Sequence, residues 1–300
     1  MQSLWTLGNK IYRIHVGREA HRLVVFLARG LLHHGKLERL DAFFQSDPAL
    51  QRIAKVYPYV YEQPTRAFFY KGSTFDERTA LMKQHMQLLL EKLPAETVIG
   101  IYDHQAPVLW QQDFDGEPLT LQLSFHAGQR KEGLLSTVLM WRGEAIYQMI
   151  FWLQRDAAGA PCAYIGAMQG PNMADSREVI KRLTKLCFGY RTKNLILYVT
   201  QAVFRALGIQ HIYAVTNEGY YANNHVRRDR KLKTSFSDFW LEAGGKKTAD
   251  SRFDELPLTE PRKTIEEVKS QKRNLYRKRY ALLDSIDAAI AESMQTVMRK

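Results

Sequence analysis

Two apolar runs flank a short polar turn at the centre of the chain: Gly133-Leu-Leu-Ser-Thr-Val-Leu-Met-Trp-Arg-Gly-Glu-Ala-Ile-Tyr-Gln-Met-Ile-Phe-Trp-Leu153. The turn Arg142-Gly143-Glu144 is typical of a β-hairpin. Upstream, Leu119-Thr-Leu-Gln-Leu-Ser-Phe125 alternates apolar and polar side chains, which is the pattern of a half-buried strand. The apolar runs Val98–Tyr102 and Cys162–Met168 have strand length. Together these segments predict an antiparallel meander of four or five strands.

Helices are expected on both sides of this meander. Before it, apolar residues recur at helical spacing between Leu23 and Leu93, and the prolines of Val56–Lys71 exclude one continuous helix there. After it, periodicity and end signals such as Gly208 predict helices over Asp175–Leu186 and Asn194–Leu207. Strands are predicted over Gln210–Thr216 and Phe236–Leu241, and a long polar helix from Arg262 to about Met298.

We therefore expect an α+β fold in three regions. These are a helical N-terminal region (1–95), an α+β domain around a mostly antiparallel central sheet (96–257), and a C-terminal helix packed on the same core (258–300).

The charge of the chain is distributed unevenly. Residues 1–176 carry 18 basic and 17 acidic side chains, whereas residues 177–300 carry 25 basic and 14 acidic ones. This asymmetry indicates an anionic partner. We expect a phosphate-bearing small molecule or acyl donor first and an anionic membrane surface second, with nucleic acid a weaker candidate; the sequence leaves the oligomeric state open.

Neither a membrane span nor a metal site is predicted. The apolar stretch Leu23–Leu32 spans ten residues, whereas a bilayer crossing needs about 20, and the N-terminus lacks the pattern of an export signal. Cys162 and Cys187 have no nearby partner cysteine, so we expect two reduced thiols and no zinc site. The expected location is the cytoplasm, with a peripheral position at the inner membrane as the second expectation.

The first candidate site is the stretch Phe188-Gly-Tyr-Arg-Thr-Lys-Asn-Leu195, which leads into a predicted helix. Cations at a helix start are disfavoured by the helix dipole unless an anion joins them, and free backbone amides at such a start bind phosphate. The alternative is a solvated loop in which Thr192 or Asn194 caps the helix. The residues predicted to bind the phosphates of a donor are Gly189, Arg191, Thr192, Lys193 and Asn194.

The second candidate site is the basic run Asn223–Lys233. Its cations would attract phosphate or carboxylate groups, and His225 could act as a general base near neutral pH. A solvated basic loop is the alternative. Glu242 is the other candidate base, with an ordinary ion pair to a neighbouring arginine as its alternative. The residues predicted to contact substrate are Gln169, Asn217, Arg227, Arg228 and Trp240.

The C-terminal helix carries a further basic surface with interleaved tyrosines. It could contact nucleic acid or anionic lipid, or it could be a solvated face. Its residues are Lys269, Lys272, Arg273, Tyr276, Arg277, Lys278, Arg279 and Tyr280. The chain contains no phosphate-binding P-loop, zinc-protease helix, hydrolase nucleophile elbow or kinase signature.

Several of these segments together resemble the VirK/YbjX family of bacteria. The resemblance spans nearly the whole chain. It rests on Glu132-Gly-Leu-Leu-Ser136, Tyr164-Ile-Gly-Ala-Met-Gln-Gly-Pro171, Leu183-Thr-Lys-Leu-Cys-Phe-Gly-Tyr-Arg191, Ala214-Val-Thr-Asn217, His225, Arg227 to Lys233, Asp238-Phe-Trp240, Gly244-Gly245, Leu256-Pro257 and Lys272-Arg273 to Tyr280-Ala-Leu-Leu-Asp284. It implies a role in virulence and in resistance to cationic antimicrobial peptides through the envelope, and it implies no catalytic residue.

The order of elements also resembles acyltransferases of the GNAT type. In that fold, the helix after the fourth strand offers its N-terminus to the pyrophosphate of coenzyme A. The family's phosphate loop, [RQ]xxGx[GA], is not matched after Gln169-Gly170, and a further predicted helix precedes Arg191. The resemblance therefore leaves the donor open among acyl-CoA, acyl carrier protein and an aminoacyl donor.

Two hypotheses follow. The first is a GNAT-like acyl- or aminoacyltransferase acting on an envelope or peptide substrate. In it, His225 or Glu242 takes the proton of the acceptor, and backbone amides near Ile165–Gln169 polarise the carbonyl. The second is a non-enzymatic stress-response adaptor that binds nucleic acid, anionic lipid or a protein through its basic C-terminal surface.

Overall fold

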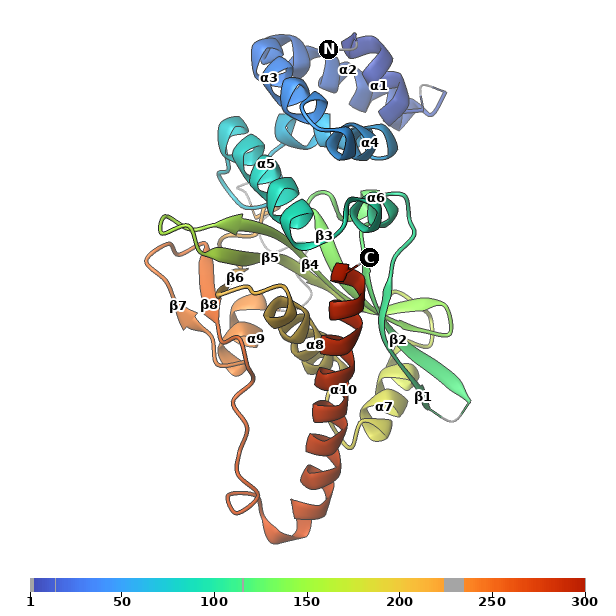
Figure 1. The fold of residues 1–300 in the computed structure, drawn as a ribbon, viewed down its shortest axis with the longest axis vertical. Helices are drawn as coiled ribbons and strands as arrows, with labels where there is room; N and C mark the ends of the chain where they lie inside the picture. Colours follow the sequence, from blue (N-terminus) through green and yellow to red (C-terminus); the bar gives the residue numbers. More distant parts are fainter. Residues whose placement is uncertain (1–2, 14, 115, 224–234, 300) are drawn as a thin grey trace.

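The computed structural model describes residues 3–13, 15–114, 116–223 and 235–299. Its N-terminal part is helical, as predicted (Figure 1). The elements are α1 (Leu4–Ile11), α2 (Gly17–Leu32), α3 (His34–Gln45), α4 (Pro48–Val56), the 3-10 helices η1 (Pro58–Tyr61) and η2 (Gln63–Thr65), α5 (Phe75–Lys92) and α6 (Ala95–Tyr102). The two 3-10 helices occupy the proline-rich passage that excluded a continuous helix.

The prediction of a strand over Val98–Tyr102 was wrong, because these residues form α6. A run of five apolar residues fits a buried strand or one side of a buried helix equally well by periodicity alone. Here Pro94 precedes the first helical residue, and Tyr102 is buried in the core, where its hydroxyl donates to the carbonyl oxygen of Leu134 at 2.7 Å.

The centre of the molecule is one sheet in the order β1-β2-β3-β4-β5-β6-β8-β7. Its strands are β1 (Val108–Phe114), β2 (Glu117–Ser124), β3 (Leu135–Trp141), β4 (Glu144–Arg155), β5 (Pro161–Gln169), β6 (His211–Val215), β7 (Lys246–Lys247) and β8 (Phe253–Leu256). The predicted hairpin is confirmed: Trp141 pairs with Glu144, and Arg142 and Gly143 both have positive φ, as a tight hairpin turn requires. Neighbouring strands are antiparallel except for β5 and β6, which are parallel.

The remaining helices are α7 (Ser176–Leu186), α8 (Thr192–Ala206), α9 (Phe236–Glu242), the 3-10 helix η4 (Ser270–Lys272) and α10 (Arg273–Arg299). In Figure 1 the N-terminal helices lie above the sheet, and α8 and α10 lie below it. Helix α8 packs on the sheet through Phe204, whose ring meets that of Phe151 on β4 at 4.7 Å. Helix α10 packs on α8, and Tyr198 donates to the carbonyl oxygen of Leu283 at 3.1 Å.

Two predictions for the C-terminal part were wrong. Phe236–Leu241 forms α9, not a strand: Phe236, Phe239 and Trp240 are buried at helical spacing, and the hydroxyl of Ser235 caps the helix. The long helix begins at Arg273 and not at Arg262. The intervening segment folds back on α10, where Arg262 forms an ion pair with Asp284 at 2.5 Å.

The structure is therefore a mixed α+β fold with a mostly antiparallel sheet and a long C-terminal helix. Buried apolar residues of the N-terminal helices, the sheet and α10 form one continuous cluster. The region boundaries near residues 95 and 257 stay a prediction. In the part of the chain that the structure describes, no helix combines the length and apolar character needed to cross a bilayer.

Candidate functional site

The parallel strands β5 and β6 separate before β5 ends. They pair from Cys162 with His211 to Ile165 with Ala214, whereas β5 continues for Gly166–Gln169 beside β4 alone. The chain returns from β5 to β6 through α7 and α8. A place where two parallel strands part leaves main-chain groups of the inner edges unpaired, which is a common position for a ligand. We refer to this place as the strand separation.

A β-bulge marks the start of the strand separation. On β4, Ile150 and Phe151 are consecutive, but their partners on β5 are Ala167 and Ile165, so Gly166 is the extra residue. A β-carbon at Gly166 would overlap the carbonyl oxygen of Glu132 and would lie 3.0 Å from the ring of Trp152. Only glycine therefore allows the backbone of Glu132 to approach the bulge.

Glu132 places a buried carboxylate beside the strand separation. Its side chain is 6% exposed, and its oxygens accept hydrogen bonds from Gln169 Nε2 and Tyr220 Oη, both at 2.9 Å. Burial, followed by the charge of Glu132, raises the pKa of Tyr220 well above its usual range. The phenol is thus held protonated beside a carboxylate, which gives an acid and a base in direct contact.

The N-terminus of α8 lies at the same end of the sheet. Burial raises the pKa of Tyr147 on β4, and the side chain of Thr192, the first residue of α8, has a smaller and opposite effect on it. The other side of the Tyr147 ring faces the end of β5, since a β-carbon at Gly170 would lie 3.4 Å from it. No side chain of the described residues caps α8 at its N-cap residue, Arg191. The predicted alternative, capping by Thr192 or Asn194, is therefore wrong.

Arg191 and Gly189 lie next to α10. Arg191 is exposed, and Gly189 has a φ of +73°, as in a left-handed turn. Arg279 of α10 lies against this turn: its Nη2 would be 3.1 Å from a β-carbon at Gly189, and it donates to the carbonyl oxygen of Phe188 at 2.9 Å. The cation that accompanies Arg191 near the start of α8 is thus Arg279 from a distant part of the sequence.

Lys193 and Glu242 form a pair with each other. Lys193 Nζ lies 3.2 Å from Glu242 Oε2 and 4.8 Å from the centre of the Phe239 ring. Glu242 is the last residue of α9, and its side chain is 63% exposed. The predicted cofactor ligand Lys193 and the predicted base Glu242 therefore form an ion pair. An ion pair was the alternative raised for Glu242 from the sequence, but its partner is this lysine and not an arginine.

Asn194 lines a small cavity of about 80 Å³ between α8, α9 and the start of the C-terminal segment. Glu242, Gln201 and Glu260 also line it, and the side-chain oxygens of Asn194 and Gln201 are buried without a hydrogen-bond partner among the described residues. Burial raises the pKa of Glu260. This set of acceptors favours a donor-rich group, such as water, over a phosphate.

Of the other predicted substrate residues, the structure describes Asn217 and Trp240. Asn217 organises the chain around α9: its side-chain oxygen accepts from the amide of Phe236 at 2.7 Å, and it also lines an open cavity of about 480 Å³ beyond β6. Trp240 is fully buried, and its Nε1 donates to the carbonyl oxygen of Val215 at 2.9 Å. His225, Arg227 and Arg228 lie outside the described residues.

An aromatic cavity of about 230 Å³ lies beside the strand separation. Trp152, Tyr164 and Tyr213 stand in a row on β4, β5 and β6, and their ring centres are 5.5 and 4.9 Å apart. Arg252 lies 4.8 Å above the ring of Tyr70 at the rim and is paired with Asp250 at 2.7 Å. The row crosses β5 at Tyr164, and the ring of Trp152 would lie 3.0 Å from a β-carbon at Gly166, so a ligand in this cavity would lie close to the bulge.

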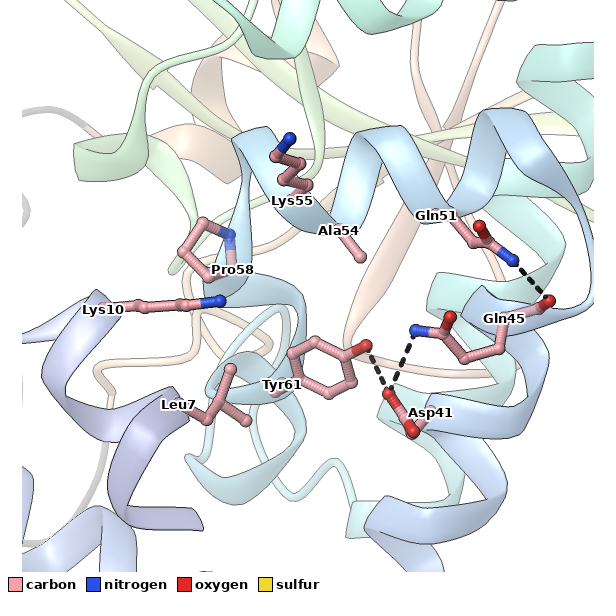
Figure 2. A pocket seen from close by; sticks show the side chains of 9 residues that line it. All are labelled: Leu7, Lys10, Asp41, Gln45, Gln51, Ala54, Lys55, Pro58 and Tyr61. Atoms are coloured by element: carbon pink, nitrogen blue, oxygen red, sulfur yellow. Dashed lines mark hydrogen bonds between the residues drawn. The ribbon is translucent and has the colours of Figure 1, made fainter. Parts of the chain in front are cut away.

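The cavity of about 570 Å³ among the N-terminal helices is larger and contains none of the predicted residues (Figure 2). Lys10 and Lys55 project from one side of it, and Asp41 lies on the other. Asp41 accepts hydrogen bonds from Tyr61 Oη at 2.7 Å and from Gln45 Nε2. Its carboxylate is thus engaged in holding helices together.

Neither thiol is prepared for nucleophilic chemistry. Cys162 and Cys187 are free and buried, and burial raises the pKa of Cys162 to about 11 and that of Cys187 to about 12. Thiolates are the reactive form, so both groups are inert near neutral pH. Among the described residues, no three His, Cys, Asp or Glu side chains gather where they could hold a metal ion.

Sequence reasoning did not assign four residues to this site: Glu132, Tyr147, Tyr220 and Arg279. Glu132 heads one of the segments that carried the family resemblance, which was the available signal. The other three are recognisable only once the strand order and the position of α10 are known.

This geometry defines a class of protein: an α+β fold in which two parallel strands separate beside a buried carboxylate. The family described as "Protein of unknown function (DUF535)" matches residues 15–292, and the chain belongs to this family. The expected resemblance to YbjX and its relatives is confirmed at this level.

Three relatives give the range of similarity. An uncharacterized protein of Haemophilus influenzae is 26% identical over 292 residues, covering 97% of this chain and 95% of its own length. The uncharacterized protein YbjX of Escherichia coli is 32% identical over 180 residues, covering 59% of this chain and 54% of YbjX. A protein of Mannheimia haemolytica named "Membrane protein LapB" is 26% identical over 193 residues, which cover 62% of this chain and 79% of LapB. No solved structure matches the chain.

Proposed function

We propose that this protein transfers an acyl or aminoacyl group to an amine or hydroxyl of an envelope or peptide substrate, with a layout like that of GNAT acyltransferases. The observation that carries the proposal is the strand separation: a parallel pair parts at a bulge while the helix that connects the two strands begins at the same end. An extended donor could lie between β5 and β6 with its phosphates toward α8.

The start of α8 supports a binding position for the phosphates of the donor. The first-turn amides of a helix have no acceptor within the helix, and the N-terminal end of the dipole favours an anion. Arg191 and Arg279 supply two cations next to this uncapped start. Helix α7 intervenes between β5 and α8, so the donor remains open among acyl-CoA, acyl carrier protein and an aminoacyl donor.

Glu132 and Tyr220 are the proposed proton acceptor and proton donor of the reaction. The acceptor nitrogen or oxygen attacks the acyl carbon and forms the new bond, and its proton passes to the Glu132 carboxylate. The bond to the leaving group breaks as the Tyr220 hydroxyl donates a proton to it. The hydrogen bond of 2.9 Å between the two groups then returns the proton from Glu132 to Tyr220 and restores both.

The acceptor is proposed to enter through the aromatic cavity. Ring faces attract ammonium groups, and Trp152, at the other end of the row from Tyr213, lies next to the bulge at Gly166. The name of one relative, "Membrane protein LapB", supports an acceptor at or near a membrane.

Donor binding is tested by thermal unfolding with acyl-CoA, acylated carrier protein and aminoacyl donors. A ligand at 100 times its dissociation constant adds about 2.7 kcal/mol, which is a rise of roughly 4 °C for a chain of this length. We expect one donor to raise the midpoint, and the rise to be lost in the double variant Arg191→Ala/Arg279→Ala but kept in Lys263→Ala, a matched exposed cation.

Two outcomes contradict the proposal. One is that no donor moves the midpoint. The other is that the double variant and the control respond equally, because the phosphate site would then lie elsewhere. Transfer itself is tested with Glu132→Gln, which should keep donor binding and lose acyl transfer.

The second candidate function, an adaptor, is favoured by one observation. Several cations on and before α10 are exposed, including Lys269, Lys272, Arg277 and Lys278. Binding to DNA through this surface would weaken steeply with salt and would be lost in Arg277→Glu/Lys278→Glu, whereas acyl transfer would not change.

A further inference from the structure

Helix α2 is apolar on two sides. Its inner side is buried through Leu23 and Phe26, which are 3% and 0% exposed. Its outer side carries Val24, Leu31 and Leu32, which are 64%, 69% and 80% exposed. A surface helix of a globular protein has one apolar face and one polar face. The outer apolar face of α2 therefore serves something other than the core of this chain.

The outer residues form a continuous strip. Val24 and Leu31 are separated by seven residues, so they lie on the same side of the helix, with Leu32 beside them, and the strip is about 12 Å long at 1.5 Å per residue. Large exposed apolar side chains are concentrated here: five of the eight in the described chain fall between Trp5 and Leu32. Scattered single residues would need no explanation, but such a concentration marks an interaction site.

Helix α1 adds an exposed tryptophan to the same end of the molecule. It packs on α2 with Leu4 against Gly30, since a β-carbon at Gly30 would lie 3.0 Å from a methyl group of Leu4. The next residue, Trp5, is 57% exposed, whereas the other four tryptophans of the chain are buried. Tryptophan is enriched at the boundary between lipid and water, where its ring is apolar and its N–H stays wet.

Basic side chains are in excess near the strip and border it on one side. Residues 3–39 carry seven basic and two acidic side chains. Arg18 and Arg22 border the strip on one side at 3.6 residues per turn. Arg29 is engaged with the rest of the protein, because its Nη1 donates to the carbonyl oxygen of Thr65 at 3.0 Å. The N-terminal end of the molecule thus combines exposed tryptophan and leucine with excess cations.

We propose that α1 and α2 dock on the surface of an anionic lipid bilayer, with Trp5, Val24, Leu31 and Leu32 in the headgroup layer and Arg18 and Arg22 facing lipid phosphates. This combination of residues is that of an interfacial amphipathic helix. A second copy of the chain fits less well, because both copies would bring a surface with excess positive charge to the contact. The docking is independent of the proposed acyl transfer.

The position of these helices separates this surface from the basic part of α10. Figure 1 places α1 and α2 at one end of the molecule and the start of α10 at the opposite end. A flat bilayer can therefore contact one of the two surfaces at a time, and charge reversals at the two ends have different expected effects.

The test is flotation of the full chain with vesicles of phosphatidylcholine alone and with vesicles that contain about 30% phosphatidylglycerol. We expect binding to the anionic vesicles, reduced at least tenfold in Leu31→Glu/Leu32→Glu and in Arg18→Glu/Arg22→Glu. Leu241→Glu removes an equally exposed leucine on α9, 70% exposed, and should bind like the wild type. Arg277→Glu/Lys278→Glu reverses charge at the α10 end and should also leave binding unchanged.

Tryptophan fluorescence gives a second readout that needs no variant at the strip. Because Trp5 is the exposed tryptophan, lipids brominated near the headgroup should quench a part of the emission that Trp5→Phe removes. Three results would overturn the proposal: no binding to either vesicle, binding lost only in the α10 variant, or a dimer in light scattering that Leu31→Glu/Leu32→Glu dissociates without any lipid binding. Circular dichroism and unchanged thermal midpoints confirm that the variants are folded.

Discussion

Two of the buried carboxylates among the described residues, Glu62 and Glu132, have different surroundings. Glu62 is fully buried where the N-terminal helices meet the sheet, and it accepts hydrogen bonds from Tyr12 at 2.6 Å and from the guanidinium groups of Arg66 and Arg130. Glu132 is buried beside the strand separation, where the described hydrogen bonds come from the amide of Gln169 and the phenol of Tyr220. The described partners of Glu62 include two cations, whereas those of Glu132 are an amide and a phenol, of which the phenol can exchange a proton.

This difference indicates different uses of a buried charge. A carboxylate held between two guanidinium groups stabilises one arrangement of the chain. A carboxylate in contact with a protonated phenol can accept and return a proton. The comparison predicts that Glu62 matters mainly for stability and Glu132 mainly for chemistry.

The largest effect is expected from Glu62→Gln. The substitution leaves two arginines without their counter-charge in a buried site, and breaking such a pair costs about 3–5 kcal/mol. Urea denaturation at neutral pH measures the free energy of unfolding. Glu96→Gln, which removes the exposed pair with Arg52, is the matched control and should leave the midpoint close to that of the wild type. If the two variants lose equal stability, Glu62 does not have the structural role assigned to it.

A buried histidine extends the comparison to a group that must stay neutral. His85 accepts a hydrogen bond from the amide of Leu153 at 3.0 Å, its other nitrogen lies 3.1 Å from the hydroxyl of Tyr102, and burial lowers its pKa to about 3. The unfolded chain, with an ordinary histidine pKa of about 6.5, binds a proton between these values that the folded chain does not bind. Stability should therefore fall as the pH drops below about 6.5, by up to about 1.4 kcal/mol per pH unit.

The measurement compares the urea midpoints of the wild type and His85→Asn at pH 7.5 and pH 4.5. Asparagine keeps an acceptor for Leu153 but does not titrate, so the wild type should lose about 3 kcal/mol more than the variant between the two pH values. Equal losses would show that His85 is protonated in the folded state or that its site opens.

Glu132→Gln should have a smaller effect on stability than Glu62→Gln. The amide can still accept from Tyr220, and the loss of one good hydrogen bond to a charged group costs about 1–3 kcal/mol. Acyl transfer should be lost while the thermal shift with donor remains. A variant that retains transfer would remove Glu132 from the proposed chemistry, and one as unstable as Glu62→Gln would erase the difference between the two carboxylates.

The central hairpin and helix α9 show how much of the fold could be predicted from the sequence. The central hairpin was predictable because Arg142 and Gly143 favour the turn and the flanking runs have strand length. Helix α9 was mistaken for a strand, although the spacing of Phe236, Phe239 and Trp240 was helical, because the aromatic run alone resembles a buried strand. A short apolar run is compatible with a buried strand and with a buried helix, and tertiary packing decides which of the two forms.

The candidate site was less predictable, for a physical reason. The start of α8 was found from Gly189 and Arg191, because cations before a helix are a local signal. Glu132 and Tyr220 are 88 residues apart, and Arg279 reaches Gly189 from α10. Contacts of this kind depend on strand order and helix position, so no local pattern announces them.

The smallest effect is expected from Glu242→Gln, which bears on the base that the sequence suggested. Glu242 is 63% exposed and paired with Lys193 at 3.2 Å. Exposed pairs contribute about 0–1 kcal/mol because water screens both charges, so the free energy of unfolding should change by about 0.5 kcal/mol or less. Acyl transfer should persist, since an exposed carboxylate already paired with a lysine is poorly placed to take a proton at the strand separation. If Glu242→Gln abolishes transfer and Glu132→Gln does not, the proton acceptor lies on α9, and the chemistry belongs to the side of the sheet that carries the start of α8.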